Sequence, residues 1–116
     1  MSVATELNDL TELDNLWQAS HERPVLFFKH SATCSISARA FQQFQQYLED
    51  DASQQVQNAL IVVQTARPVS HRLAELSGVQ HESPQAILVR NGKVVWHDSH
   101  FELKRKTLAI AVENQR

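Results

Sequence analysis

"PVLFFKHSATCSIS", residues 24–37, decides the fold because one hydrophobic pattern gives way to another within it. Pro24 precedes four consecutive apolar residues, Val25–Phe28, which is typical of a strand buried on both faces. From Ser35 onward apolar residues recur every four positions, at Ile36, Ala40, Phe44 and Leu48. That spacing predicts a helix over about 35–50. A buried strand therefore leads directly into a helix, and Cys34 stands at the junction.

The rest of the chain supplies partners for this strand and helix. "ALIVVQ", residues 59–64, is a second continuous apolar run and predicts a second buried strand. "QAILVR" and "KVVWHD", residues 85–90 and 93–98, flank Asn91-Gly92, which predicts a β-hairpin with a type I′ turn. Further helices are expected over about 11–20, from Pro68 or Ser70 to Gly78, and within 102–115.

This order of elements predicts an α/β fold in a single domain over residues 1–116. Two buried strands joined through a helix imply a right-handed parallel crossover. The hairpin must extend the same sheet antiparallel, because its alternating apolar residues need a surface to bury against. We therefore expect a mixed four-stranded sheet with helices on both faces and an extra helix at the N-terminus.

The composition excludes several classes of protein. A formal charge of −2 and a pI near 6.3 give no basic surface for nucleic acid or an anionic membrane. No apolar run approaches the roughly 20 residues that span a bilayer, and "MSVATELNDL" lacks the pattern of a signal peptide. A single cysteine cannot form an internal disulfide. We expect a cytoplasmic protein whose thiol is reduced, with no nucleic-acid or membrane partner.

Cys34 is the candidate nucleophile. The unpaired N–H groups and the positive end of the dipole at a helix N-terminus favour a thiolate over a thiol. Thr33, Ser35 and Ser37 supply hydroxyls that could donate to the sulfur. Against this stands the simpler interpretation, in which a lone cysteine is an inert filler of the core.

Lys29 and His30 end the preceding strand and could add positive charge near Cys34. Side chains alternate along a strand, so at most one of the two points at the sulfur. Six histidines and one cysteine could suggest a metal, but His30 and Cys34 flank a turn and no ligand motif supports them. His97 and His100 lie at a strand end, where solvated histidine is the ordinary interpretation. We predict no metal site.

"CSIS" places Ser37 three residues after Cys34, on the same face of the predicted helix. In a C-x-x-C site the second sulfur occupies that position and resolves the mixed disulfide internally. With serine there, the resolving thiol must come from another molecule. Serine is also common at helix starts for capping reasons, so the pattern alone does not decide between a redox site and a cap.

Three separated blocks carry a resemblance to a known family: "PVLFFKHSATCSIS", "VVQTARPVS" and "GVQHESPQAILVRNGKVVWHDSH". Together with their spacing, they make nearly the whole chain resemble the monothiol bacilliredoxins, which have a thioredoxin-like fold. The resemblance implies that Cys34 is the redox nucleophile and that Pro84 follows a cis peptide bond. It also implies that the backbone of Ser83 pairs with the bound thiol substrate.

The implied function is a cytoplasmic monothiol thiol–disulfide oxidoreductase. Cys34 and Ser37 are the expected catalytic residues, and substrate binding is expected at Thr33, Ser35, Ser83, Pro84 and Lys29. Bacillithiol would be the thiol co-substrate, with no tightly bound cofactor, and the partners would be S-bacillithiolated proteins. The protein is expected to be a monomer or weak dimer.

One position departs from the family pattern, which has proline where this chain has Ser35. Proline there would remove an N–H group and pre-set the first helical turn. We expect the helix to form without it, and the reactivity of the thiol to differ from that of a typical member.

Two alternatives stay open on the sequence. The first is a non-catalytic thioredoxin-like binding module in which Cys34 is incidental. The second is a carrier resembling monothiol glutaredoxins, in which Cys34 and an external thiol from each of two chains hold a [2Fe–2S] cluster.

Overall fold

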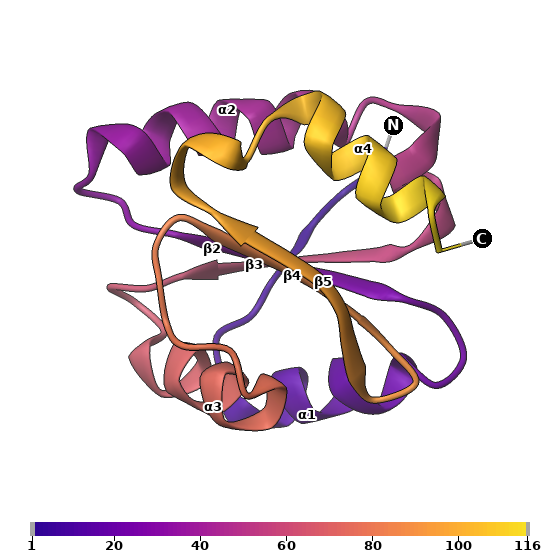
Figure 1. The fold of residues 1–116 in the computed structure, drawn as a ribbon. Helices are drawn as coiled ribbons and strands as arrows, with labels where there is room; N and C mark the ends of the chain where they lie inside the picture. The colour runs from indigo at the N-terminus through magenta and orange to yellow at the C-terminus, as the bar shows by residue number, and fades with distance from the viewer. Residues whose placement is uncertain (1, 116) are drawn as a thin grey trace.

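The computed structural model describes residues 2–115, which form a mixed sheet between two layers of helices (Figure 1). The strand order is β1-β3-β2-β4-β5. β2 and β3 are parallel, β4 runs antiparallel to β2, and β5 runs antiparallel to β4. The strands span, in chain order, Thr5–Glu6, Val25–His30, Gln57–Val62, Gln85–Arg90 and Lys93–Ser99.

Helices α1 and α3 cover one face of the sheet, and α2 and α4 cover the other (Figure 1). The four helices span Leu10–Ala19, Ser35–Tyr47, Arg67–Ser77 and Arg105–Glu113. Two short 3₁₀ turns, η1 (Asp51–Gln55) and η2 (His100–Glu102), precede β3 and α4. No helix among the described residues is both long and apolar enough to cross a membrane.

The predicted α/β sandwich with a mixed sheet is confirmed, but the sheet has five strands rather than four. The strand that was missed, β1, consists of two exposed residues paired with Ala59 and Leu60 of β3. Two residues are too short to show the period-two alternation by which strands are recognised.

The expected hairpin turn, the start of α2 and the end of α3 are present, whereas α3 begins at Arg67 rather than at Pro68 or Ser70. Asn91 and Gly92 both have positive φ, 55° and 71°, as a type I′ hairpin turn requires. Gly78 ends α3 in the left-handed conformation. α2 begins at Ser35, so its first turn forms without the family's proline.

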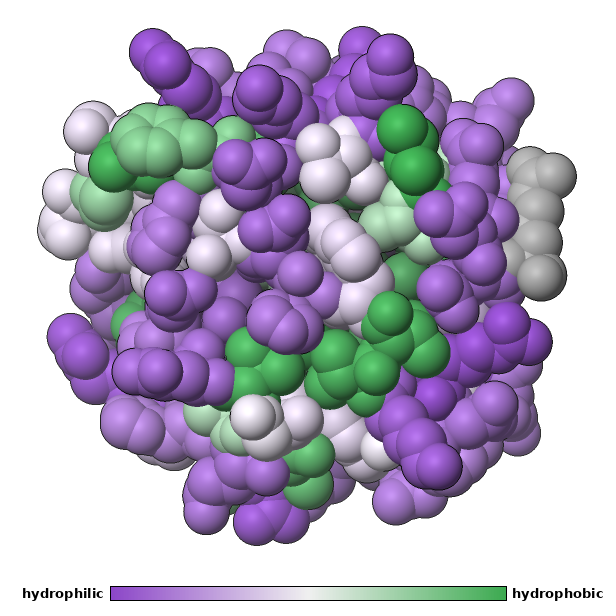
Figure 2. Space-filling model, viewed as in Figure 1, coloured by the Kyte–Doolittle hydropathy of each residue, from purple (hydrophilic) through white to green (hydrophobic). Residues whose placement is uncertain are grey.

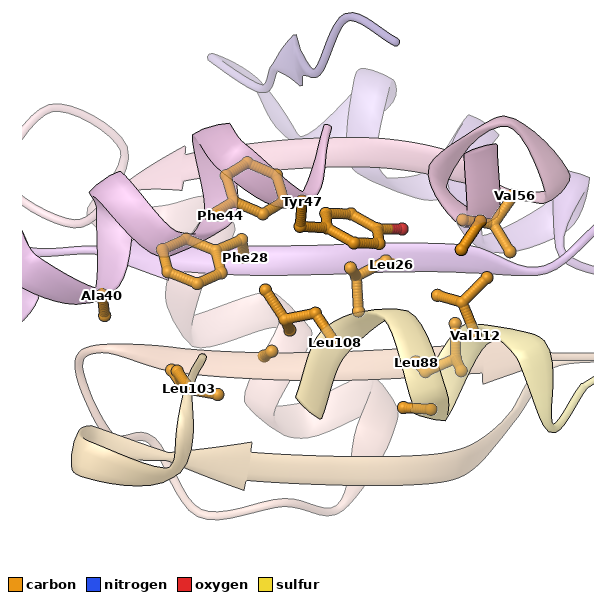
Figure 3. Packing of buried hydrophobic residues seen from close by; sticks show 13 residues of the cluster. Leu26, Phe28, Ala40, Phe44, Tyr47, Val56, Leu88, Leu103, Leu108 and Val112 are labelled. Atoms are coloured by element: carbon orange, nitrogen blue, oxygen red, sulfur yellow. The ribbon is translucent and has the colours of Figure 1, made fainter. Parts of the chain in front are cut away.

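Alternation along β2 divides the hydrophobic core between the two faces of the sheet. Phe28 points toward α2 and α4, where its ring stacks on Phe44 with 4.4 Å between centroids (Figure 3). Phe27 points the other way, into the layer formed by α1 and α3. Lys29 and His30, the next pair along the strand, diverge in the same manner, and this separation sets their different roles at the site.

Candidate active site

Cys34 lies at the carboxyl end of β2, where the chain crosses to the start of α2. It is the N-cap residue of α2, with an extended backbone (φ −108°, ψ 128°), and its carbonyl accepts the Ala38 N–H at 3.0 Å. The thiol is free and half-buried. Its side chain makes no capping hydrogen bond to the first turn of α2 within residues 2–115, so the thiol remains unpaired and partly accessible at the helix start.

Two side chains hold the loop that leads to Cys34. The Ser37 hydroxyl, which is buried, accepts the Ser31 N–H at 2.8 Å. Gln64, which follows β3, accepts the Ala32 N–H at 3.0 Å through its Oε1. Its Nε2 donates to Ser31 Oγ at 2.8 Å and to Thr33 Oγ1 at 3.3 Å. The loop is thus tied both to α2 behind it and to the neighbouring strand.

His30 faces α2 and lies 2.9 Å from the Ser37 hydroxyl through its Nδ1. Its ring stacks on Phe41 with 4.5 Å between centroids. Burial lowers the pKa of His30, and the hydrogen bond with Ser37 offsets only part of that decrease. The ring is therefore neutral at pH 7. When Nδ1 carries the proton, Ser37 Oγ accepts two hydrogen bonds, one from His30 and one from the Ser31 N–H.

The Ser83–Pro84 peptide bond is cis and lies at the same edge of the sheet. Pro84 directly precedes β4, whose first residue pairs with Lys29 near the end of β2. The Pro84 carbonyl accepts the His100 N–H at 3.1 Å, which joins this loop to the turn after β5. The Ser83 hydroxyl is buried and has no hydrogen-bond partner among residues 2–115.

The prediction that Lys29 binds substrate is wrong, because its side chain is buried away from Cys34. Its side chain is fully buried and points into the layer formed by α1 and α3, on the opposite face of the sheet from α2. The ammonium donates to the Ser70 carbonyl at 3.2 Å and lies 3.1 Å from His81 Nδ1. Strand alternation sends His30, not Lys29, toward the helix that Cys34 caps.

The buried Lys29 instead anchors the segment that carries the cis proline. Burial lowers its pKa to about 8, so it is still charged at pH 7. Burial lowers the pKa of His81, and the nearby charge of Lys29 lowers it further. A neutral His81 accepts the ammonium's hydrogen bond at Nδ1, two residues before Ser83.

The two remaining predicted residues lie on the surface beside Cys34. Thr33 is exposed, and its hydroxyl accepts from Gln64. Ser35 is exposed at the first position of α2, with no side-chain hydrogen bond within residues 2–115. Their roles toward a substrate stay predictions.

Sequence reasoning missed several residues that the fold brings to this edge of the sheet. Gln64 lies two residues after the parallel strand β3, and the carboxyl ends of parallel strands are where sites form, so its position was a usable signal. His81 lies in the same quoted block as Ser83. His100 was interpreted as a solvated strand-end residue, yet its backbone binds Pro84. Within the described part of the chain, no group of three or more His, Cys, Asp or Glu residues could hold a metal ion.

Comparison with known proteins identifies the family and supports the fold. Residues 5–108 match the family described as monothiol bacilliredoxin BrxC. A solved structure described as that of a candidate oxidoreductase with a thioredoxin fold is 35% identical to this chain, with a TM-score of 0.78. That match covers 94% of this chain and 93% of the other.

Two thioredoxins share the fold at low identity. The Malassezia sympodialis protein is 11% identical with a TM-score of 0.76, covering 98% of this chain and 91% of its own. The Fasciola hepatica protein is 12% identical with a TM-score of 0.75, covering 97% and 99%. The family match and the 35% identical oxidoreductase support thiol oxidoreductase chemistry at the level of the family. The chain belongs to the monothiol bacilliredoxin family.

Proposed function

We propose that this protein removes bacillithiol from mixed disulfides on other proteins, with Cys34 as its nucleophile. The observation that carries the proposal is the location of the chain's only cysteine. It caps α2 at the edge of the sheet where the cis Ser83–Pro84 loop also lies. An incidental core cysteine would not need the two side chains, Ser37 and Gln64, that fix the loop before it.

The proposed exchange proceeds in two displacements. The Cys34 thiolate attacks the bacillithiol sulfur of the mixed disulfide, forming a Cys34–bacillithiol disulfide and releasing the client cysteine as a thiolate that takes up a proton. The thiolate of a second bacillithiol then attacks the bacillithiol sulfur bound to Cys34. Bacillithiol disulfide leaves and the Cys34 thiolate is restored. Because the chain holds no second cysteine, the second thiol must come from outside.

The surrounding residues have distinct proposed roles. The N–H groups of the first turn of α2 and the Ser37 hydroxyl would stabilise the negative sulfur. The backbone of Ser83 would pair with the incoming disulfide, while Thr33 and Ser35 would line its approach. We further propose that the protein acts in the cytoplasm as a monomer or weak dimer, where the thiol pool keeps Cys34 reduced.

Intact-mass measurement tests the first displacement. Reduced protein is incubated with bacillithiol disulfide and, separately, with glutathione disulfide from pH 5 to 9. We expect rapid addition of one bacillithiol, at Cys34. Cys34→Ser is the control and should add nothing.

A bacillithiolated client protein tests the complete reaction. Wild-type protein with excess bacillithiol should restore the client thiol, whereas Cys34→Ala should not. If neither small disulfide modifies Cys34 and the client stays modified, the catalytic proposal is wrong and a non-catalytic binding module is the better description. A brown, iron-containing protein after anaerobic purification would instead favour the cluster carrier.

A further inference from the structure

A groove runs beside the first turns of α2, bounded on its other side by η2 and the segment that follows it. Its volume is about 380 Å³, and Ile36, Ala40 and Leu103 supply its apolar lining. A second hollow of about 230 Å³ adjoins it, lined by Ser35, Ile36, Arg39 and Phe101. Cys34 lines neither hollow, but Ile36, two residues after it, lines both, so the groove lies within one turn of α2 from the candidate nucleophile.

Phe101 stands at the mouth of this groove with 65% of its surface exposed. Figure 2 shows hydrophobic atoms gathered over the start of α2 and the η2 turn, at the upper left, with hydrophilic side chains around them. Exposing a large aromatic side chain forgoes the stabilisation that its burial would give. Exposed aromatic side chains beside a cleft are a common feature of ligand sites.

His100 holds the Phe101 turn in an unusual backbone conformation. Its φ is +57°, a left-handed value that few residues other than glycine adopt, although histidine does so more often than most. Its N–H is bound to the Pro84 carbonyl at 3.1 Å, so the turn is tied to the cis-proline loop. Strained backbone of this kind concentrates at functional sites, where the surrounding structure maintains it.

The charges along the groove favour an anion. Arg39 and Lys104 line it with one opposing carboxylate, Glu102. The Arg39 guanidinium makes no hydrogen bond or ion pair with any residue from 2 to 115. This local excess of cations contrasts with the net charge of −2 for the whole chain. A guanidinium left free at the edge of an apolar groove is suited to bind a carboxylate through two parallel hydrogen bonds.

We infer that this groove is the subsite for the body of a carboxylate-bearing low-molecular-weight thiol, with Arg39 binding a carboxylate and Phe101 covering the rest of the molecule. The inference rests on the proposed function and deepens it, since it assigns the part of the site that holds the small thiol rather than the client. Bacillithiol, through its malate part, and glutathione both have this chemistry. A neutral thiol lacks the group that Arg39 would bind.

Rates of mixed-disulfide formation at Cys34 test the subsite. Wild-type protein and Arg39→Gln are reacted with bacillithiol disulfide, glutathione disulfide and the uncharged disulfide of 2-mercaptoethanol. We expect Arg39→Gln to slow the two carboxylate-bearing disulfides about 5- to 10-fold, which is the scale of one lost charge-assisted hydrogen bond at a solvated site. The uncharged disulfide should react at the wild-type rate. Arg39→Lys should recover part of the loss.

Arg72→Gln is the matched control, because Arg72 lies on α3 on the other face of the sheet, where it forms only an exposed ion pair with Asp14. It should leave all three rates unchanged. Binding without chemistry gives a second readout: S-methyl glutathione added to Cys34→Ser should shift the NMR signals of residues 36–43 and 100–104, and Phe101→Ala should weaken its binding.

The outcomes distinguish an error in the proposed function from an error in the subsite. If wild-type Cys34 reacts with none of the three disulfides, the proposed function is wrong. If it reacts with all three and Arg39→Gln changes either none of the rates or all of them equally, the thiol chemistry stands and the subsite is overturned. Binding shifts confined to other residues would also overturn it.

Discussion

Ser37 combines two tasks in one hydroxyl group. It accepts the Ser31 N–H and bonds with His30 Nδ1, so it ties the loop before Cys34 to the helix after it. The side chain is fully buried, so neither the Ser31 N–H nor His30 Nδ1 can form a hydrogen bond with water in its place unless the loop moves. Serine in the C-x-x-S arrangement is therefore a structural requirement here as well as a candidate donor to the sulfur.

Replacing Ser37 with alanine should lower both stability and reactivity. The change leaves the Ser31 N–H without its acceptor, which costs about 1–3 kcal/mol of unfolding free energy. Urea unfolding measures that loss, and the rate of Cys34 alkylation at pH 7 measures the effect on the thiol. We expect alkylation to slow, because Ser37 no longer fixes the loop that leads to Cys34.

Thr11→Ala, which removes an exposed hydroxyl on α1, is the control for the Ser37 variant. It should change neither the unfolding free energy by more than about 0.5 kcal/mol nor the alkylation rate. A Ser37→Ala protein that is destabilised but is alkylated at the wild-type rate would show that Ser37 supports the fold and does not affect the reactivity of Cys34.

The residues that could be predicted from the sequence depend on local spacing, whereas the residues that were missed depend on contacts far apart in the chain. Cys34 and Ser37 are set by local spacing at a helix start, which is visible in the sequence. Gln64 acts through contacts with a loop about thirty positions earlier. The burial of Lys29 against α3 depends on which face of the sheet it occupies. Such long-range contacts leave no periodic signal.

At the scale of elements, the connection from α3 to β4 determines where the cis proline lies. α3 ends at Gly78, which has φ +71°, and the next six residues lead to Pro84. A side chain added at Gly78 would meet no atom within 4 Å. The preference for glycine at position 78 therefore comes from the left-handed backbone conformation alone.

Gly78→Ala should destabilise the protein by about 1 kcal/mol, because a residue with a Cβ adopts the left-handed conformation at a cost. Thermal unfolding measures the change. Gly78→Asn should cost less, since asparagine tolerates this conformation better. Equal losses in the two variants would contradict a backbone origin. The rate of Cys34 modification by a small disulfide should stay unchanged in both.

The elements themselves were largely predictable, since each long one carries a hydrophobic period. The hairpin was predicted at its observed residues, 85–90 and 93 onward, because Asn91-Gly92 fixes the turn. The second buried strand lies at 57–62 rather than 59–64, since β3 begins with the polar residues Gln57 and Asn58. The Asn58 amide donates to the Ser53 carbonyl and its Oδ1 accepts from the Tyr47 hydroxyl, so a polar residue is satisfied inside the core.

At the scale of the whole molecule, the two hydrophobic layers differ in the side chains that they enclose. The layer under α2 and α4 is built around stacked rings, among them Phe28, Phe44 and Tyr47 (Figure 3). The layer under α1 and α3 encloses the Lys29 ammonium, which has hydrogen bonds but no carboxylate partner among residues 2–115. The order of helices and strands predicted both layers, but a charge enclosed in one of them was not foreseen. An unneutralised buried charge costs stability, and that cost depends on pH.

The sign of this dependence follows from the pKa of Lys29, about 8 in the folded chain against 10.5 for an ordinary lysine. Between these values the unfolded chain binds a proton that the folded chain does not, so stability rises with pH. Below pH 8 both states are charged and the full cost of burying the ammonium remains. From pH 8 to 9.5 we therefore expect Lys29 to contribute a gain of about 1–2 kcal/mol.

Comparison with Lys29→Met isolates that gain, because methionine keeps an unbranched chain of similar size without the charge. Urea unfolding of both proteins from pH 6 to 9.5 gives the difference in unfolding free energy, and groups common to both cancel. The range ends at pH 9.5 so that both proteins stay folded: burial raises the pKa of Tyr47, so ionisation of tyrosine in the unfolded chain destabilises both at higher pH. The stability of wild type relative to the variant should rise steadily above pH 8. A difference that stays constant across this range would mean that Lys29 titrates as a solvated lysine does, and that its ammonium is not held in the closed contact with Ser70 and His81.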